Sequence, residues 1–297
     1  MSLPSLPLSA RLVQLLCRRA PVQWGKLRLV RWAANRCLVQ GERLQATQLN
    51  CGLEIECDLS LLIQQQLFFT GSYHTERQQL ADWRRQARSS RVILDVGANV
   101  GIYSLEAKAA NPQAQVLAFE PTPQWAAHLR GTIARNAITG LEVLEAGASS
   151  TPGRAILQTF DGSPAQGHPT NEGMNFITPH LNGAQGFEVQ LTSLDHEAHS
   201  RGWQRIDLVK IDVQGHEPAV LEGASDLLQR QAIGCLFIEI NGLQPGEPGE
   251  KALRLLSNAG YHFRPAGRPS QPLAAAGPWL QGIDDLVAMP AQSPQQA

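Results

Sequence analysis

Five short apolar runs, alternating with helix-like segments, constrain the fold of this chain more than any other feature. The runs lie at residues 92–94, 116–119, 141–144, 206–211 and 235–240. Helices are expected at residues 103–110, at residues 124–135 and from about residue 217, where Pro218 suits a first helical turn. Strands that alternate with helices form βαβ units and a parallel sheet with helices on both faces. We therefore predict a Rossmann-like, mostly parallel sheet of about seven strands.

The length of 297 residues allows one large α/β domain with an appendage. We expect an N-terminal helical extension over residues 1–50, a main domain over residues 51–290 and a flexible tail over residues 291–297. A net charge of -1 does not argue for a nucleic-acid partner.

The main domain is expected to have three parts. Alternating apolar residues at 53–59 suit a half-buried strand, which together with a polar helix near residues 75–88 would form a cover over residues 53–90. The Rossmann-like core would occupy residues 91–290. A polar stretch rich in Gly, Pro and Asn interrupts it as an insert at about residues 160–187, which is typical of a functional lid or a disordered segment.

The five cysteines indicate a cytoplasmic protein with reduced thiols. They are scattered and show neither a CxxC pair nor zinc-type spacing: Cys17, Cys37, Cys51, Cys57 and Cys235. The sequence has no apolar run of about 18 residues that would predict a transmembrane helix.

Every ionisable residue before Glu42 is basic. These residues are Arg11, Arg18, Arg19, Lys26, Arg28, Arg31 and Arg36. Such a start is typical of a transit peptide or a membrane-surface segment. We favour an amphipathic helical lead-in that packs on the main domain or on a partner subunit, because charged helix faces are usually just solvated. A weak membrane-surface or partner contact remains the alternative.

The first apolar run leads into a glycine turn. The run ends in Asp95, and Gly97 and Gly101 allow an unusual backbone and the close approach of a ligand. A dinucleotide fingerprint would have a second glycine where this chain has Asn99. Asp95 would repel a phosphate but suits the ammonium of a methionine moiety. The loop therefore favours S-adenosylmethionine, which has a cationic sulfonium and no phosphate, over a nicotinamide cofactor.

A second acid ends the next run. Glu120 follows Gly101 by 19 positions, where a carboxylate is placed to accept hydrogen bonds from ribose hydroxyls. Two acids at neighbouring strand ends, beside one glycine turn, form a single constellation.

The fourth run carries charges that are costly to bury in a parallel strand covered on both faces. Lys210 and Asp212 are two residues apart and point the same way, as a structural ion pair or as an active-site pair, and we favour the second. Gly215 would then turn the chain and present His216 and Glu217 at the cleft. His216, with an ordinary pKa of about 6.5, is the natural general base for a poorly acidic hydroxyl.

Three blocks together resemble the FkbM-type methyltransferases. They are residues 95–104, residues 119–121 and residues 210–217, and shorter stretches at residues 192–195, 220–224 and 285–290 agree. The similarity covers about residues 50–290. The resemblance implies a class I methyltransferase fold and S-adenosylmethionine-dependent O-methylation of a sugar, glycan or secondary-metabolite hydroxyl.

The family pattern also implies roles for individual residues. Asp95, Gly97, Asn99 and Glu120 would contact the cofactor, and Asp212 would lie near the methyl-transfer centre. We add Ala98, Gly101 and Ala148 to the expected cofactor contacts, and we expect Lys210, Asp212 and His216 to be the catalytic residues.

Two alternative functions fit the same sheet. They are a nicotinamide-dependent oxidoreductase and a non-catalytic cofactor-binding module. His196 and His199 are three apart, whereas a zincin motif needs four, so a surface helix is the better interpretation and no metal is expected. The tryptophans are expected to be packing anchors, although Trp279 could line the acceptor cleft.

Overall fold

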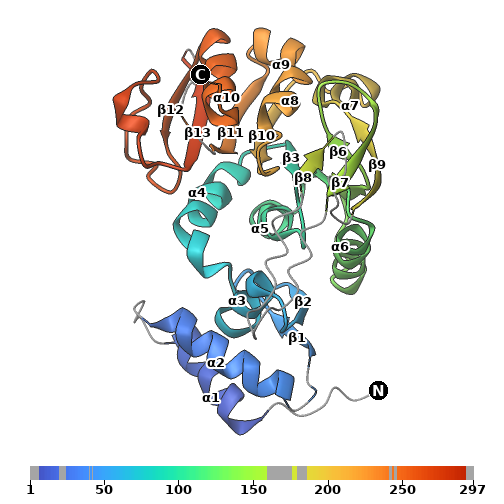
Figure 1. Ribbon diagram of the computed structural model, residues 1–297, viewed down its shortest axis with the longest axis vertical. Coiled ribbons are helices and arrows are strands. Elements are labelled where there is room, and N and C mark those ends of the chain that lie inside the picture. The colour runs from blue at the N-terminus through green and yellow to red at the C-terminus, as the bar shows by residue number, and fades with distance from the viewer. Residues whose placement is uncertain are drawn as a thin grey trace. The chain divides into compact units, whose positions relative to one another are not determined.

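The computed structural model describes residues 7–19, 25–39, 41, 43–158, 176–178, 186–240, 243 and 246–291. The chain divides into two compact units (Figure 1). The first unit contains the described residues up to Arg77 together with Ala134–Ala137, and the second unit contains the rest. Most of the insert expected at 160–187, and all of the expected tail after residue 291, lie outside the described residues.

The first unit is built from three helices and a hairpin. The helices α1 (Leu8–Arg19) and α2 (Lys26–Val39) lie side by side and both contact α3 (Leu62–Thr70). The strands β1 (Leu44–Gln48) and β2 (Glu54–Asp58) pair antiparallel. The predicted N-terminal helices and hairpin are therefore confirmed. No helix among the described residues is long and apolar enough to cross a membrane.

The second unit contains a seven-stranded sheet with the order β12-β13-β11-β10-β3-β4-β5. Its strands are β3 (Val92–Val96), β4 (Gln115–Phe119), β5 (Leu141–Leu144), β10 (Ile206–Ile211), β11 (Ile233–Glu239), β12 (Tyr261–Pro265) and β13 (Asp285–Pro290). The five strands from β11 to β5 are parallel, and β13 runs antiparallel to both of its neighbours. The predicted mostly parallel seven-stranded sheet is confirmed.

Helices cover the sheet, as the alternating pattern predicts. They are α4 (Arg77–Ala87), α5 (Ile102–Ala110), α6 (Pro123–Arg135), α7 (Leu194–Ser200), α8 (Glu217–Glu222), α9 (Ser225–Gln229) and α10 (Pro248–Asn258). Two short 3-10 helices lie at His74–Glu76 and Pro278–Leu280. His196 and His199 are exposed on α7, so the interpretation of this pair as part of a surface helix is confirmed.

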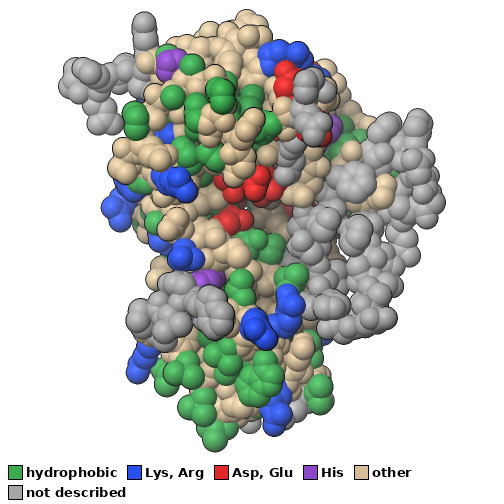
Figure 2. Space-filling view, turned by 60° about the vertical axis from the view of Figure 1, so that its left-hand side comes forward, with side chains coloured by type: hydrophobic (Ala, Val, Ile, Leu, Met, Phe, Trp, Pro, Cys, Tyr) green, Lys and Arg blue, Asp and Glu red, His purple; other side chains and the backbone are tan. Residues whose placement is uncertain are grey.

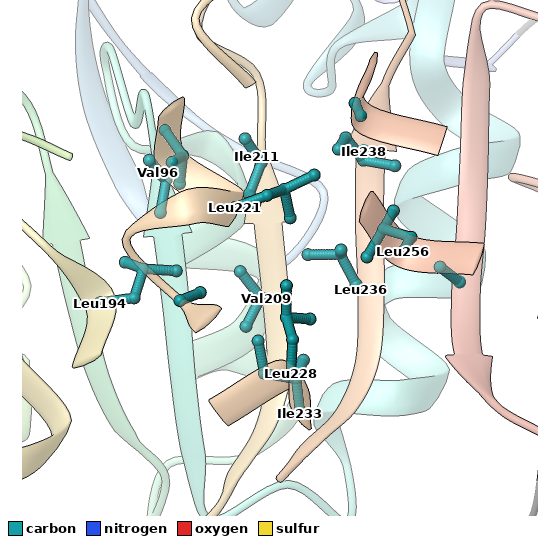
Figure 3. Close-up of a cluster of buried hydrophobic side chains, with 14 of the residues drawn as sticks. Val96, Leu194, Val209, Ile211, Leu221, Leu228, Ile233, Leu236, Ile238 and Leu256 are labelled. Carbon is teal, nitrogen blue, oxygen red and sulfur yellow. The ribbon is translucent and has the colours of Figure 1, made fainter. Parts of the chain in front are cut away.

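Successive residues of a strand point to opposite faces of the sheet. Because the strands of the sheet are apolar along most of their length, both faces are apolar. On one face, Val209 and Leu236 pack in a cluster with Leu221 of α8, Leu228 of α9 and Leu256 of α10 (Figure 3). On the other face an aromatic stack covers the strands. Trp83 of α4 meets the Tyr103 and Phe237 rings edge-on, with centroids 5.2 and 5.3 Å away. Burial of this kind stabilises a domain by about 25 cal/mol per Å² of apolar area.

A second, four-stranded sheet lies where the strand–helix rhythm stops. Its order is β6-β9-β7-β8, with strands at Gly147–Ala148, Gly186–Thr192, Gly153–Gln158 and Phe176–Thr178 respectively. The sequence pattern predicted only a break in rhythm there. The strands β7 and β9 pair antiparallel across the polar insert, a long-range contact that no local periodicity reports.

The strand order reverses between β3 and β10. From β3 the chain proceeds to β4 and β5 on one side, while β10 and β11 follow on the other. In open α/β sheets, ligands bind at the carboxyl ends of the strands at such a switch point. The glycine turn after β3 and the charged residues after β10 both lie there.

Candidate active site

The turn after β3 is in backbone contact with the end of β10. Gly97 and Gly101 have φ angles of 83° and 84°, a left-handed conformation that favours glycine. A Cβ atom on Gly97 would overlap the carbonyl oxygen of Asp212. The Asp212 amide in turn donates to the Val96 carbonyl at 3.1 Å. Gly97 therefore lets the two strand ends at the switch point approach each other.

Three backbone amides of this turn already have partners within the protein. The Gly97 and Ala98 amides donate to the Phe119 carbonyl at 3.1 and 3.0 Å, and the Gly101 amide donates to the Ala98 carbonyl at 2.7 Å. A pyrophosphate site needs such amides for the ligand. The loop therefore fits a cofactor without phosphate better than a dinucleotide.

Asp95 closes the start of α5, where a dinucleotide would place its phosphates. Its carboxylate accepts hydrogen bonds from the Ser104 amide at 2.9 Å and from the Ser104 hydroxyl at 2.6 Å. The carboxylate thus occupies the positive end of the helix. Burial raises the pKa of Asp95, and the Ser104 bonds and the Lys210 charge oppose that shift. The structure therefore places Asp95 as a brace of the loop–helix junction.

Glu120 connects the tip of β4 to the glycine turn. One carboxylate oxygen accepts from the Asn99 amide at 2.7 Å, and the other accepts from the Thr122 amide at 2.8 Å. Burial raises the pKa of Glu120, and these hydrogen bonds act against the shift. Each carboxylate oxygen has a second lone pair. The Thr122 side chain also bonds to the carboxylate, and the remaining acceptor capacity is open to a hydroxyl such as that of a ribose.

Of the residues predicted to contact the cofactor, those of the glycine turn and Glu120 lie at this switch point. Gly97, Ala98, Asn99 and Gly101 form a turn that no added Cβ could enter at Gly97, and Glu120 supplies carboxylate acceptors beside it. Ala148, in β6, is 1% exposed.

Lys210 and Asp212 form an ion pair at the end of β10. The Lys210 ammonium is 2.9 Å from the Asp212 carboxylate and lies 4.8 Å from the centroid of the Tyr103 ring. The Lys210 side chain is 3% exposed and the Asp212 side chain 32%, so solvent reaches the pair only from the Asp212 side. Both interpretations of this pair, structural and catalytic, are compatible with its geometry.

A second carboxyl group, which the sequence analysis missed, belongs to this cluster. The Gln214 amide nitrogen donates to Asp212 at 3.0 Å and to Glu239, at the end of β11, at 2.9 Å. Burial alone would raise the pKa of Asp212, but the Lys210 charge and hydrogen bonds lower it to about 2. Burial and the Asp212 charge raise the pKa of Glu239 to about 8. At neutral pH the two carboxyls therefore hold one proton between them.

Glu239 carries the same sequence signal as Glu120, since each is an acid that ends an apolar run. Asp285 of β13 stands opposite Glu239 in the antiparallel register and accepts a hydrogen bond from the Gln79 side chain at 3.2 Å. Acidic side chains gather near the centre of the face in Figure 2.

His216 makes its side-chain contact with Ser149. Its Nε2 atom is 3.0 Å from the Ser149 hydroxyl, which follows β6. Burial lowers the pKa of His216, and the Glu222 charge raises it. The imidazole is therefore neutral at neutral pH. The structure brings Lys210 and Asp212 together, but it pairs His216 with Ser149.

Glu217, which the sequence predicts beside His216 at the cleft, supports the turn after β10 with one carboxylate oxygen, while its Oε2 has no hydrogen-bond partner among the described residues. Its side chain is buried, and Oε1 accepts from the Val213 and Gly215 amides at 3.1 Å each. The carboxylate holds the tight turn that the sequence assigned to Gly215 alone.

The Trp279 indole donates a hydrogen bond to the Ala275 carbonyl at 2.9 Å. The described residues contain no group of three or more His, Cys, Asp and Glu side chains arranged to hold a metal ion.

The strand order, with antiparallel β13 between β11 and β12, and the carboxylate-flanked glycine turn define a methyltransferase-type α/β protein of class I. The methyltransferase FkbM domain model matches residues 95–263, more than half of the chain. The chain therefore belongs to the FkbM methyltransferase family, whose methyl donor is S-adenosylmethionine. The resemblance noted in the sequence is confirmed.

The chain spans less than two thirds of the length of the curated relatives that it matches. Methyltransferase sdnD of Sordaria araneosa is 32% identical over 160 residues, 46% of this chain and 62% of sdnD. Hexuronic acid methyltransferase AglP of Haloferax volcanii is 29% identical over 175 residues, 59% of this chain and 64% of AglP. The 31-O-demethyl-FK506 methyltransferase FkbM of Streptomyces tacrolimicus is 29% identical over 161 residues, 48% of this chain and 62% of that protein. A solved S-adenosylmethionine-dependent methyltransferase from Agrobacterium tumefaciens has a TM-score of 0.44 at 8% identity, covering 83% of this chain and 69% of that chain.

Proposed function

We propose that this protein transfers a methyl group from S-adenosylmethionine to a hydroxyl of a sugar, glycan or secondary-metabolite acceptor. The observation that carries the proposal is the Glu120 carboxylate, which is bound to the Asn99 amide in the region that matches the FkbM domain. The names of two relatives, a hexuronic acid methyltransferase and a 31-O-demethyl-FK506 methyltransferase, support a hydroxylated acceptor.

The cofactor is assigned to the switch point of the sheet. Glu120 would accept hydrogen bonds from the ribose diol, and residues 97–101 would lie against the nucleoside and methionine portions. When bound, S-adenosylmethionine supplies a methyl group on a positively charged sulfur. The Asp212 carboxylate, kept ionised by Lys210, is a negative charge suited to that positive end of the ligand. The Asp95 carboxylate already bonds to the start of α5, where a nicotinamide cofactor would place its phosphates, so this alternative cofactor is disfavoured.

We assign His216 the role of general base. It would accept the proton that the acceptor hydroxyl loses as its oxygen bonds to the methyl group. The imidazole is neutral at neutral pH because burial lowers its pKa, so it is able to accept a proton. Because Nε2 contacts the Ser149 hydroxyl, the proton would reach Nδ1 directly or Nε2 through Ser149.

Calorimetric titration with S-adenosylmethionine tests the proposal, and a saturable heat is expected. With a panel of uronic acids and polyhydroxylated acceptors, release of S-adenosylhomocysteine should then depend on the acceptor. His216→Ala is expected to lower the transfer rate by about 100-fold or more and to leave the cofactor Kd within about twofold. The exposed His196 of α7 provides the matched control, His196→Ala. A folded protein that shows no heat rejects the proposal, and an unchanged rate removes His216 from the role of base.

The native protein is expected to lose stability as pH rises, because the pKa of Glu239 is raised on folding. Glu239→Gln should remove this loss. The pKa of Glu239 is about 8 in the folded protein, against an ordinary value of 4.5. Between these values only the unfolded chain ionises this carboxyl. The free energy of unfolding therefore falls as pH rises towards about 8 and levels off above it.

Thermal midpoints measured from about pH 5 to about pH 9 check this prediction. The advantage of Glu239→Gln over the native protein should grow across that window. Glu188→Gln, on an exposed strand position, is the control and should show a constant difference. A constant difference for Glu239→Gln as well would contradict the shared proton.

A further inference from the structure

The helices α1 and α2 expose their larger apolar side chains and bury their smaller ones. The buried positions of α1 are Ala10, Val13 and Cys17, and those of α2 are Val30, Ala33, Ala34 and Cys37. Every large hydrophobic side chain that is exposed in the described residues lies between Leu8 and Leu44: Leu8, Leu12, Leu15, Leu16, Leu27, Leu29, Trp32, Val39 and Leu44. Exposed apolar side chains gathered on one pair of helices mark an interaction site.

The exposed leucines of α1 form one stripe. Leu8, Leu12, Leu15 and Leu16 have the spacing i, i+4, i+7 and i+8, so they share a helix face. Leu12 and Leu16 are 52% and 55% exposed. In Figure 2, green apolar and blue basic side chains gather together on the unit that carries α1 and α2.

The charge on this surface has one sign. The described residues of α1 and α2 include no acid, and six of their arginines are exposed: Arg11, Arg18, Arg19, Arg28, Arg31 and Arg36. Arg18 differs, because its guanidinium binds the Thr47 hydroxyl at 2.7 Å and the Phe68 carbonyl at 3.1 Å. The whole chain has a net charge of -1, so the remainder of the protein is acidic.

We propose that α1 and α2 dock the protein on an anionic lipid surface. The leucine stripe would enter the boundary between headgroups and acyl chains, and the arginines would contact lipid phosphates. Each basic side chain near such a surface strengthens binding by about fivefold. A second copy of this chain is a poorer occupant, because it would bring the same arginines against one another. The inference does not depend on the identity of the methyl acceptor.

Vesicle co-sedimentation of the full chain tests the proposal. The native protein should bind vesicles made of equal parts phosphatidylcholine and phosphatidylglycerol, and it should bind phosphatidylcholine vesicles at least about tenfold more weakly. Binding to the anionic vesicles should fall steeply when salt is raised to about 0.5 M. This salt series needs no variant and therefore does not depend on how a variant folds.

Two pairs of substitutions separate the apolar and charged contributions. Leu12→Gln with Leu16→Gln should lower binding by about tenfold or more, because exposed glutamines keep the helix and lose the apolar contact. Arg11→Gln with Arg31→Gln should lower it by a similar factor. Arg154→Gln with Arg254→Gln makes the same charge change at exposed sites elsewhere and should bind as the native protein does.

Three outcomes overturn the proposal. They are no binding of the native protein to anionic vesicles, equal binding to both kinds of vesicle, and unchanged binding of the Leu12/Leu16 variant. A native dimer that the leucine substitutions dissociate, without any vesicle binding, would instead assign this surface to self-association.

Discussion

Glu120→Gln is expected to weaken the binding of S-adenosylmethionine by about 100-fold or more. The glutamine NH₂ group would face an amide donor, of Asn99 or of Thr122, where the carboxylate now accepts a hydrogen bond. Hydrogen bonds to a charged group contribute about 1.5–3 kcal/mol each, so losing one in the loop and one to the ribose accounts for this factor. Calorimetric titration measures the change in Kd.

S-adenosylhomocysteine should lose affinity by the same factor, because it carries the same ribose. The control is Glu145→Gln, whose exposed carboxylate pairs only with exposed Arg130 and should leave the Kd within about twofold. A Kd for Glu120→Gln within about threefold of the native value would remove the ribose role from Glu120 and with it the main support for the cofactor site.

Asp82→Ala is expected to lower the free energy of unfolding by about 3–5 kcal/mol, the cost of leaving a buried charge unpaired. The Asp82 carboxylate, in α4, lies 2.6 Å from the Arg264 guanidinium of β12, and their side chains are 0% and 4% exposed. Asp82 also accepts from the Gly267 amide at 3.2 Å. Urea unfolding followed by tryptophan fluorescence measures the loss.

The exposed Asp226–Arg230 pair supplies the matched control. Its atoms are 2.9 Å apart, and Asp226→Ala should lower the free energy of unfolding far less than Asp82→Ala does, because solvent screens the pair. The double variant Asp82→Leu with Arg264→Met should recover most of the stability, since an apolar pair needs no charge compensation. Equal losses for Asp82→Ala and Asp226→Ala would show that burial does not strengthen the dependence on this pair.

The sheet was predictable because its signals are local. Each central strand is a short apolar run, and Gly97 and Gly101 mark the turn at which the backbone takes positive φ angles. The small sheet of β6 to β9 was not predictable, because β7 and β9 pair across a polar insert. Only tertiary pairing makes those residues strands.

The candidate site was predictable in its residue types but not in its contacts. Asp95 and Glu120 stand at the strand ends where the sequence predicts them, yet Asp95 bonds to Ser104, and this bond depends on how α5 packs. Glu239 joins Asp212 only because β11 lies next to β10. His216 meets Ser149 across 67 residues of sequence.

The sequence by itself determined the alternation of strands and helices, the glycine turn with its two acids and the family, because periodicity and residue type are written locally along the chain. Only the tertiary structure decided which carboxyls share a proton, which amides the turn keeps for itself and which apolar side chains of α1 and α2 face solvent. Those outcomes depend on which strand ends and helix faces meet, and on how far burial strengthens the interaction between the charges brought together.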